Sequence, residues 1–191
     1  MKAKVIQICG TNGTGKTTLV KGLLNSGAFL RMDLPVGGEI KEWWYDGQVA
    51  VIGRYARNNC CGVDASKYSA DLLLTVIDTI LAAYGPSTVI FEDMRFGGSY
   101  TFKRRAREIA QKHSGEYIAV ALVASLETVS RRVIERTGNP DVDFDRVRQK
   151  ARQVIRSTQK ISADGAKVFF IDSERLDKGA MLGALRAIIR E

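Results

Sequence analysis

Apolar residues fall into short bursts along this chain, and the bursts alternate with longer stretches in which apolar positions recur at helical spacing. Alternation of this kind is typical of a parallel sheet whose strands are connected by helices. The bursts predict strands at residues 4–9, 28–32, 88–91, 117–124 and 167–171, and the helical spacing predicts helices at about 16–24, 65–84, 99–113, 126–136, 141–161 and 174–190. We therefore expect a single α/β domain over residues 1–191, with a five-stranded parallel sheet, helices on both faces, and ligands beyond the carboxyl ends of the strands.

The segment between the second and third predicted strands breaks this alternation. The sequence EWWYDGQVAVIG holds Asp46 and Gly47 between β-prone flanks, which predicts a hairpin. The loop RYARNNCCGVD follows it. Residues 39–64 are therefore expected to form a small β-hairpin insertion in the α/β domain.

The strongest chemical signal is GTNGTGKT at residues 10–17, a complete G-x-x-x-x-G-K-[ST] phosphate loop between a predicted strand and a predicted helix. The backbone N–H groups of such a loop and the positive end of the helix can wrap a triphosphate. We expect Lys16 to reach the β and γ phosphates, Thr17 to ligand Mg²⁺, and Thr18 to lie near the α phosphate. The residues expected to bind ATP are Gly10, Thr11, Asn12, Gly13, Thr14, Gly15, Lys16, Thr17 and Thr18.

Two carboxylates end the third predicted strand, in the sequence VIFEDMR at residues 89–95. This strand lies beside the first in a doubly wound sheet, so its carboxyl end faces the γ phosphate. We expect Glu92 to accept the proton of an attacking hydroxyl and Asp93 to lie near the metal, although strand alternation sends the two side chains to opposite faces. Arg95 in the next loop is suited to phosphate or substrate oxygens, and equally to an ion pair with Asp93.

The phosphate loop and the strand-end acid resemble the P-loop kinases of the nucleoside and nucleotide monophosphate family, which includes thymidylate kinases. The resemblance extends from Lys4 to the last predicted strand, and it implies a kinase that uses ATP and Mg²⁺. It also implies an arginine-bearing lid at about residues 131–145 that closes on ATP, with Arg132 and Arg136 as catalytic residues on one helical face. The alternative for these arginines is an ordinary exposed face of an amphipathic helix.

The chain departs from the usual pattern of that family in two places. The usual acid followed directly by Arg is replaced by EDMR at residues 92–95, and WWYDGQVAVIGRYARNNCCGVD replaces the common nucleotide-binding helices. This segment, with GRY at 53–55 ahead of CGVD at 61–64, looks like a set of small bacteriophage P-loop kinases that act on 5-hydroxymethyluracil within DNA. That resemblance implies transfer of the ATP γ phosphate to the hydroxymethyl oxygen, which gives 5-phosphomethyl-deoxyuridine as a step of thymidine hypermodification.

The net charge of +8 over 191 residues is concentrated in one part of the chain, since residues 103–160 hold 14 basic and 7 acidic side chains. A basic surface of this size predicts salt-sensitive, sequence-tolerant binding of DNA, and the alternative is a solvated helix face. The alternative to a DNA kinase is a nucleoside or deoxynucleoside monophosphate kinase that acts on free nucleotides, and the second alternative is a nucleic-acid-stimulated P-loop ATPase. The basic residues concerned are the cluster Lys103, Arg104, Arg105 and Arg107 and the series Arg148, Arg152, Arg156 and Lys160, which recur every four residues on one helical face.

Aromatic residues of the insertion are candidates for holding a base that has left the duplex stack. Trp43 and Tyr45 share one face of a strand while Trp44 faces the other, so at least one of these rings is expected to pack in the core. Arg54 and Asp64 are suited to the uracil edge or to structural roles. The substrate-binding candidates are Trp43, Arg54, Tyr55, Asp64 and Arg95.

The three cysteines indicate a reducing environment. Cys9, Cys60 and Cys61 cannot all pair, and adjacent cysteines form a disulfide only with a distorted backbone. We therefore expect free thiols and a cytoplasmic location. A single histidine, His113, argues against a structural zinc site.

Overall fold

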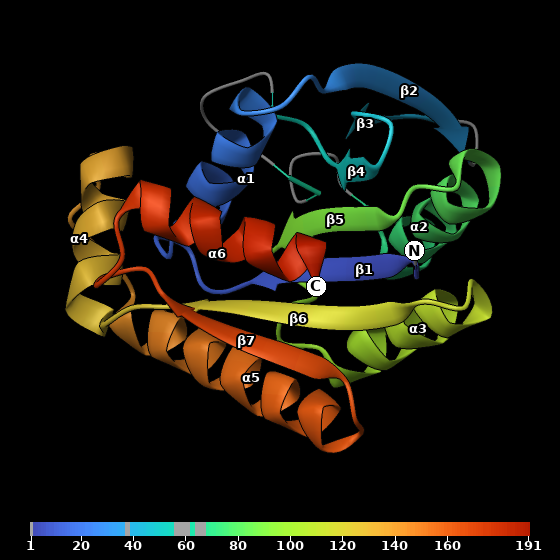
Figure 1. Ribbon diagram of the computed structural model, residues 1–191. Coiled ribbons are helices and arrows are strands. Elements are labelled where there is room, and N and C mark those ends of the chain that lie inside the picture. The colour runs from blue at the N-terminus through green and yellow to red at the C-terminus, as the bar shows by residue number, and fades with distance from the viewer. Residues whose placement is uncertain (1, 37–38, 56–61, 64–67) are drawn as a thin grey trace.

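Seven strands form one sheet, in the order β2-β3-β4-β5-β1-β6-β7 (Figure 1). The computed structural model describes residues 2–36, 39–55, 62–63 and 68–191. β2 and β3 lie antiparallel at one side of the sheet, and the other five strands are parallel to one another. The strands are β1 (Lys4–Cys9), β2 (Leu30–Val36), β3 (Glu39–Tyr45), β4 (Val49–Ile52), β5 (Thr88–Asp93), β6 (Glu116–Val123) and β7 (Lys167–Asp172).

The α/β architecture is confirmed, but the sheet has seven strands and not the five that the sequence predicts. The predicted second strand falls in β2, which pairs antiparallel with β3, and the strand beside β5 is instead β4, the second half of the predicted hairpin. The hairpin turn has the expected chemistry, because Asp46 Oδ1 accepts hydrogen bonds from the backbone N–H groups of Gln48 and Val49 at 2.9 and 2.7 Å. Because β4 pairs with β5, the hairpin is part of the main sheet.

Helices cover both faces of the sheet (Figure 1). α1 and α6 pack on one face, α2, α3 and α5 pack on the other, and each face has its own apolar core. Three helices, α2, α5 and α6, begin several residues later than their apolar spacing predicts. Ser69, Asp143 and Asp177 cap them by accepting hydrogen bonds from the backbone N–H groups of Leu72, Arg146 and Ala180. The helices are α1 (Lys16–Asn25), α2 (Ala70–Tyr84), α3 (Tyr100–Lys112), α4 (Leu126–Thr137), α5 (Phe144–Ala163) and α6 (Lys178–Arg190).

The connections of β1 place the candidate site. β1 lies between β5 and β6, so the chain leaves its carboxyl end at the point where the strand order reverses, which is where open α/β sheets bind ligands. The phosphate loop begins at this point, directly after Cys9, whose thiol is buried and free of any disulfide. Among the described helices, none is both long enough and apolar enough to cross a membrane.

Candidate active site

The loop between β1 and α1 depends on glycine at two close backbone contacts. Gly10 has a φ of 154°, and a Cβ at this position would lie 2.8 Å from the carbonyl oxygen of Leu122 in β6. Gly13 has a φ of 83°, and a Cβ there would lie 2.7 Å from the carbonyl oxygen of Val129 in α4. The loop is thus held between β6 and α4, in a conformation that L side chains rarely adopt.

Lys16 and Thr17 begin α1 at the mouth of this loop. The Lys16 ammonium donates hydrogen bonds to the carbonyl oxygens of Gly10 and Thr11, each at 2.9 Å. Its side chain therefore folds back over the loop and places the positive charge where a bound triphosphate would lie.

Glu92 approaches Thr17 from the end of β5. Thr17 Oγ1 donates a hydrogen bond of 2.7 Å to Glu92 Oε1, and Glu92 is only 2 % exposed. A hydroxyl and a carboxylate oxygen are ligands that suit Mg²⁺, which takes its remaining ligands from water and nucleotide phosphates. No cluster of three His, Cys, Asp or Glu side chains suited to a metal occurs in the described ranges, and a magnesium ion bound with nucleotide needs none.

Asp93 lies on the other face of the strand, where its carboxylate is fully buried. Its Oδ1 accepts the backbone N–H groups of Phe96 and Gly97 at 2.6 and 2.7 Å, and its Oδ2 accepts Gln7 Nε2 at 2.6 Å. Gln7 in turn accepts a hydrogen bond from the Tyr117 hydroxyl, and burial raises the pKa of Tyr117 well above its usual value. This placement argues against the metal-ligand role that we expected for Asp93, and it indicates that Asp93 shapes the loop after β5.

Replacing Asp93 with alanine should therefore destabilise the fold. The change leaves two buried donors and one partly buried donor without their acceptor. We expect this to cost about 3 kcal/mol and to lower the melting temperature by about 6–12 °C. Thermal unfolding followed by circular dichroism would measure this. Asp33→Ala, at an exposed position, is the matched control and should change stability by less than about 1 kcal/mol. A normal melting temperature together with lost phosphoryl transfer would instead return Asp93 to a catalytic role.

Arg95 and the predicted substrate residues are only partly brought to the site. Arg95 donates a hydrogen bond of 2.6 Å to the carbonyl oxygen of Tyr68, so it fastens the loop after β5 to the segment before α2. Arg54 is half exposed, with its Nε 3.6 Å from a carboxylate oxygen of Glu42. Tyr55 is 6 % exposed and packs in the core on the α1 side. Asp64, Cys60 and Cys61 lie outside the described residues.

Trp43 does not occupy the position of a stacking platform. It is 1 % exposed and packs against Tyr45 and Tyr84, with ring centroids 5.4 and 4.8 Å away. A base could stack on this ring only if the core beneath α2 opened. The base-stacking role expected for Trp43 therefore does not fit its position, and the core alternative for this residue holds.

A cavity of about 670 Å³ extends from the phosphate loop toward α6. Its walls come from the phosphate loop and α1, from the second half of α4, and from the segment between β7 and α6. Both arginines predicted for the lid contribute to it. The lining residues are Asn12, Gly13, Gly15, Lys16, Thr17, Thr18, Arg132, Glu135, Arg136, Ser173, Leu176, Asp177, Lys178 and Met181.

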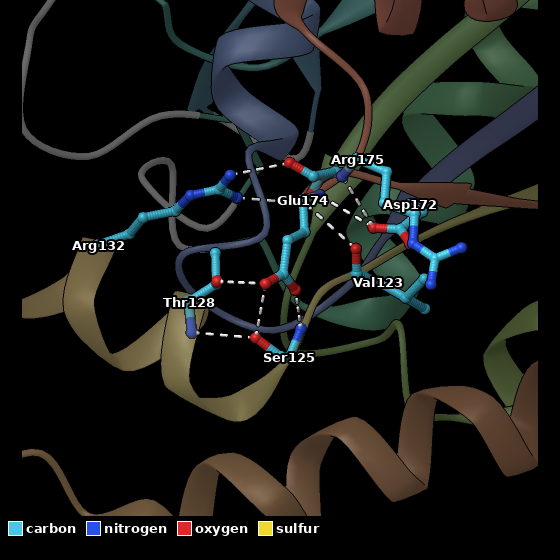
Figure 2. Close-up of polar contacts among 8 residues, drawn as sticks. Val123, Ser125, Thr128, Arg132, Asp172, Glu174 and Arg175 are labelled. Atoms are coloured by element: carbon cyan, nitrogen blue, oxygen red, sulfur yellow. Dashed lines mark hydrogen bonds and ion pairs between the residues drawn. The ribbon is translucent and has the colours of Figure 1, made fainter.

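Arg132 joins three parts of this cavity wall. Its guanidinium donates to the carbonyl oxygen of Gly13 at 3.3 Å, to Ser173 Oγ at 3.2 Å and to the Ser173 carbonyl oxygen at 2.8 Å. Figure 2 shows Arg132 extending from α4 toward the segment that carries Glu174. The residue thus connects α4, the phosphate loop and the β7–α6 segment, while Arg136 lines the same cavity one turn later.

Glu174 holds the start of α4 beside the same segment (Figure 2). Its carboxylate accepts hydrogen bonds from the Ser125 backbone at 2.8 Å, from Thr128 Oγ1 at 2.8 Å and from Ser125 Oγ at 3.1 Å. These bonds lower the pKa of Glu174 below its usual value, and the bond from the Ser125 backbone N–H has the largest effect. A carboxylate that stays ionised is favourable at a helix N-terminus, so Glu174 fixes the end of the helix that presents Arg132.

The cavity residues that follow β7 are not predicted from the sequence. Apolar spacing predicts one helix over residues 174–190, whereas α6 begins at Lys178, and Ser173, Leu176 and Asp177 line the cavity ahead of it. Two signals pointed to this. The segment follows the carboxyl end of a parallel strand, where ligands bind, and Asp177 is a good helix cap.

Comparisons with known proteins support the fold. No protein-family model matches the chain, and no curated protein matches its sequence. The YorR protein of Bacillus subtilis, solved in complex with phosphorylated GDP, has a TM-score of 0.60 at 12% identity over 97% of this chain and 95% of that chain. A kinase candidate from Chloroflexus aurantiacus has a TM-score of 0.58 at 17% identity over 99% and 97% of the two chains. A sugar kinase from Janibacter sp. HTCC2649 has a TM-score of 0.53 at 12% identity over 97% and 93%. The chain therefore has an α/β fold of the P-loop kinase type.

Proposed function

We propose that the protein is a Mg²⁺- and ATP-dependent kinase that phosphorylates the hydroxymethyl group of 5-hydroxymethyluracil in DNA. The observation that carries the kinase proposal is the hydrogen bond of 2.7 Å between Thr17 and Glu92 at the mouth of a complete phosphate loop. It brings the hydroxyl that suits Mg²⁺ and a buried carboxylate to one point, beside a cavity large enough for a nucleotide.

In the proposed reaction, the hydroxymethyl oxygen of the base attacks the γ phosphorus of ATP. A new P–O bond forms, the bond from the γ phosphorus to the bridging oxygen breaks, and ADP leaves. The hydroxyl proton passes to the Glu92 carboxylate, while Lys16 and the lid arginines stabilise charge on the transferred group. Thr17 and Glu92 would hold Mg²⁺, which supplies further stabilisation of the phosphate charge. Glu92 is thus the candidate for both roles that the sequence divides between Glu92 and Asp93.

DNA as the acceptor is supported by the resemblance to bacteriophage kinases and by the basic surplus of residues 103–160. A kinase for free nucleosides or nucleoside monophosphates is the second candidate. It is favoured by the fold shared with YorR, a protein solved with a phosphorylated nucleotide. The two candidates differ in the acceptor and share the same ATP site.

Transfer of label from γ-labelled ATP distinguishes these candidates. We expect label to enter an oligonucleotide that contains 5-hydroxymethyluracil, and to remain on the modified nucleoside after enzymatic digestion. The matched control is the same oligonucleotide with thymine, which should stay unlabelled. Label that enters only free 5-hydroxymethyl-deoxyuridine or its monophosphate would contradict the DNA proposal. Release of phosphate with no labelled acceptor would favour the ATPase hypothesis.

A further inference from the structure

A second hollow of about 720 Å³ lies along α5 between Asp143 and Arg156, apart from the nucleotide cavity. The N-terminal end of α5 lies at the same end of the sheet as the carboxyl ends of the parallel strands (Figure 1). Three of its arginines recur every four residues and so extend about 12 Å along the helix axis. The lining residues are Asp143, Asp145, Arg146, Arg148, Gln149, Arg152, Gln153 and Arg156.

These arginines differ from the basic residues of α3 in their partners. Arg105 forms an ion pair of 2.6 Å with Asp71. Arg104 lies 3.5 Å from Glu108 one turn later, but both side chains are more than half exposed, so this pair is weak. Lys103 is fully buried and donates to Cys9 Sγ at 3.5 Å. The cluster that the sequence predicts at residues 103–107 therefore does not form one free basic surface.

On α5 the positive charge is largely uncompensated. Neither Arg152 nor Arg156 has a hydrogen-bond or ion-pair partner anywhere in the described ranges. Arg148 lies 3.2 Å from Asp145, but both side chains are more than half exposed, so this pair is weak. At the far end of the same face, Lys160 lies 4.2 Å from the centre of the Tyr100 ring. The free charge is therefore concentrated in the hollow.

The hollow is joined to the loop that follows β5, the strand that carries the proposed catalytic carboxylate. Ser157 Oγ donates a hydrogen bond of 2.9 Å to the carbonyl oxygen of Gly97, and a Cβ at Gly98 would lie 3.1 Å from the Cβ of Gln153. Both glycines belong to the loop that runs from β5 to α3, and β5 ends at Asp93, one residue after Glu92. An acceptor bound along α5 is thus beside the loop that leads to Glu92.

We propose that Arg148, Arg152 and Arg156, the α5 arginine track, bind the phosphodiester backbone of the DNA strand that carries the acceptor base. This inference rests on the proposed function and states where the polymer lies. Planar guanidinium groups bind phosphate oxygens in pairs, and about 12 Å of helix matches about three phosphates of one strand. Such contacts position a strand without reading its sequence.

The test compares two variants that each lose three positive charges. The track variant is R148Q/R152Q/R156Q, and the control variant is K2Q/R186Q/R190Q, whose residues lie outside both hollows. Binding of a fluorescent oligonucleotide with one 5-hydroxymethyluracil is measured from low to moderate salt. For the track variant, we expect binding about 10- to 100-fold weaker and a salt slope reduced by about 2 to 3. The control variant should bind as the wild type does, and circular dichroism melts check that both variants fold.

Transfer of label to the oligonucleotide and to free 5-hydroxymethyl-deoxyuridine separates binding from chemistry. We expect the track variant to show a higher KM for the oligonucleotide and unchanged transfer to the free nucleoside. If the track variant bound the oligonucleotide as tightly as the wild type, or lost transfer to both acceptors equally, the proposed role of the α5 arginine track in DNA binding would be wrong. A wild-type protein that binds DNA through these arginines but phosphorylates no acceptor in it would support the track and overturn the proposed function.

Discussion

Replacing Lys16 with alanine is expected to lower phosphoryl transfer from ATP by about a thousandfold or more. The Lys16 ammonium lies at the mouth of the phosphate loop, 2.9 Å from two loop carbonyl oxygens. A methyl group can neither offset the charge of the transferring phosphoryl group nor donate to these carbonyls, so ATP affinity should fall as well. Initial rates with labelled ATP, and titration with a fluorescent ATP analogue, would measure the two effects separately.

Lys21→Ala is the matched control for this change. Lys21 lies in the same helix but outside the residues that line the nucleotide cavity, so its loss should leave transfer near the wild-type rate. Thermal melts of both variants would show whether either loses its fold. Unchanged transfer by a folded Lys16→Ala variant would contradict the assignment of the phosphate loop.

Local signals in the sequence were sufficient for most helices and for the strands of the central sheet. β1, β5 and β6 are apolar runs buried by helices on both faces, so their composition identifies them. β7 has a similar apolar run, although only Ile171 in it is buried. The pairing of the insertion was not predictable in the same way. Whether β2 or β4 lies beside β5 depends on contacts between segments far apart in the chain.

In the candidate site too, some features follow from local sequence and others depend on packing between distant segments. The phosphate loop is contiguous, so eight residues specify both its chemistry and its place between strand and helix. The roles of Glu92 and Asp93 depend on which face of β5 each side chain occupies, and that was fixed by the packing of α1 on one face and of α3 and α5 on the other. The contacts of Arg132 with Ser173 join residues 41 positions apart, and no local pattern encodes them.

Exposure was the property that composition predicted least well. Trp43 and the α3 cluster have residue types suited to nucleic acid, yet Trp43 and Lys103 are buried in the folded protein. The arginines of α5 are also suited to nucleic acid, and they remain exposed. The opposite face of the helix, with Val154, Ser157 and Ile161, packs against the rest of the protein. The net charge of +8 therefore indicates a binding surface only after each basic residue has been placed, and on α5 Arg152 and Arg156 are exposed without a partner in the described ranges.

Replacing Glu92 with glutamine should lower the rate of transfer by about a hundredfold. The amide keeps an oxygen that can accept the Thr17 hydrogen bond, so the local geometry should persist while the negative charge is lost. Rates at saturating ATP and acceptor would measure this effect. Glu127→Gln, at an exposed position in the first turn of α4, is the control and should transfer normally.

The magnesium dependence of the Glu92→Gln variant distinguishes the two roles proposed for this carboxylate. If Glu92 mainly holds the metal, the variant should need a higher Mg²⁺ concentration and should recover part of its rate when Mg²⁺ is raised. If Glu92 mainly accepts the hydroxyl proton, the rate should stay low at every Mg²⁺ concentration, because no metal replaces the lost base. Near-normal turnover at ordinary Mg²⁺ would exclude both roles. Since Asp93 is buried and already accepts three hydrogen bonds, the proton acceptor would then have to be the phosphate itself or a residue of another segment.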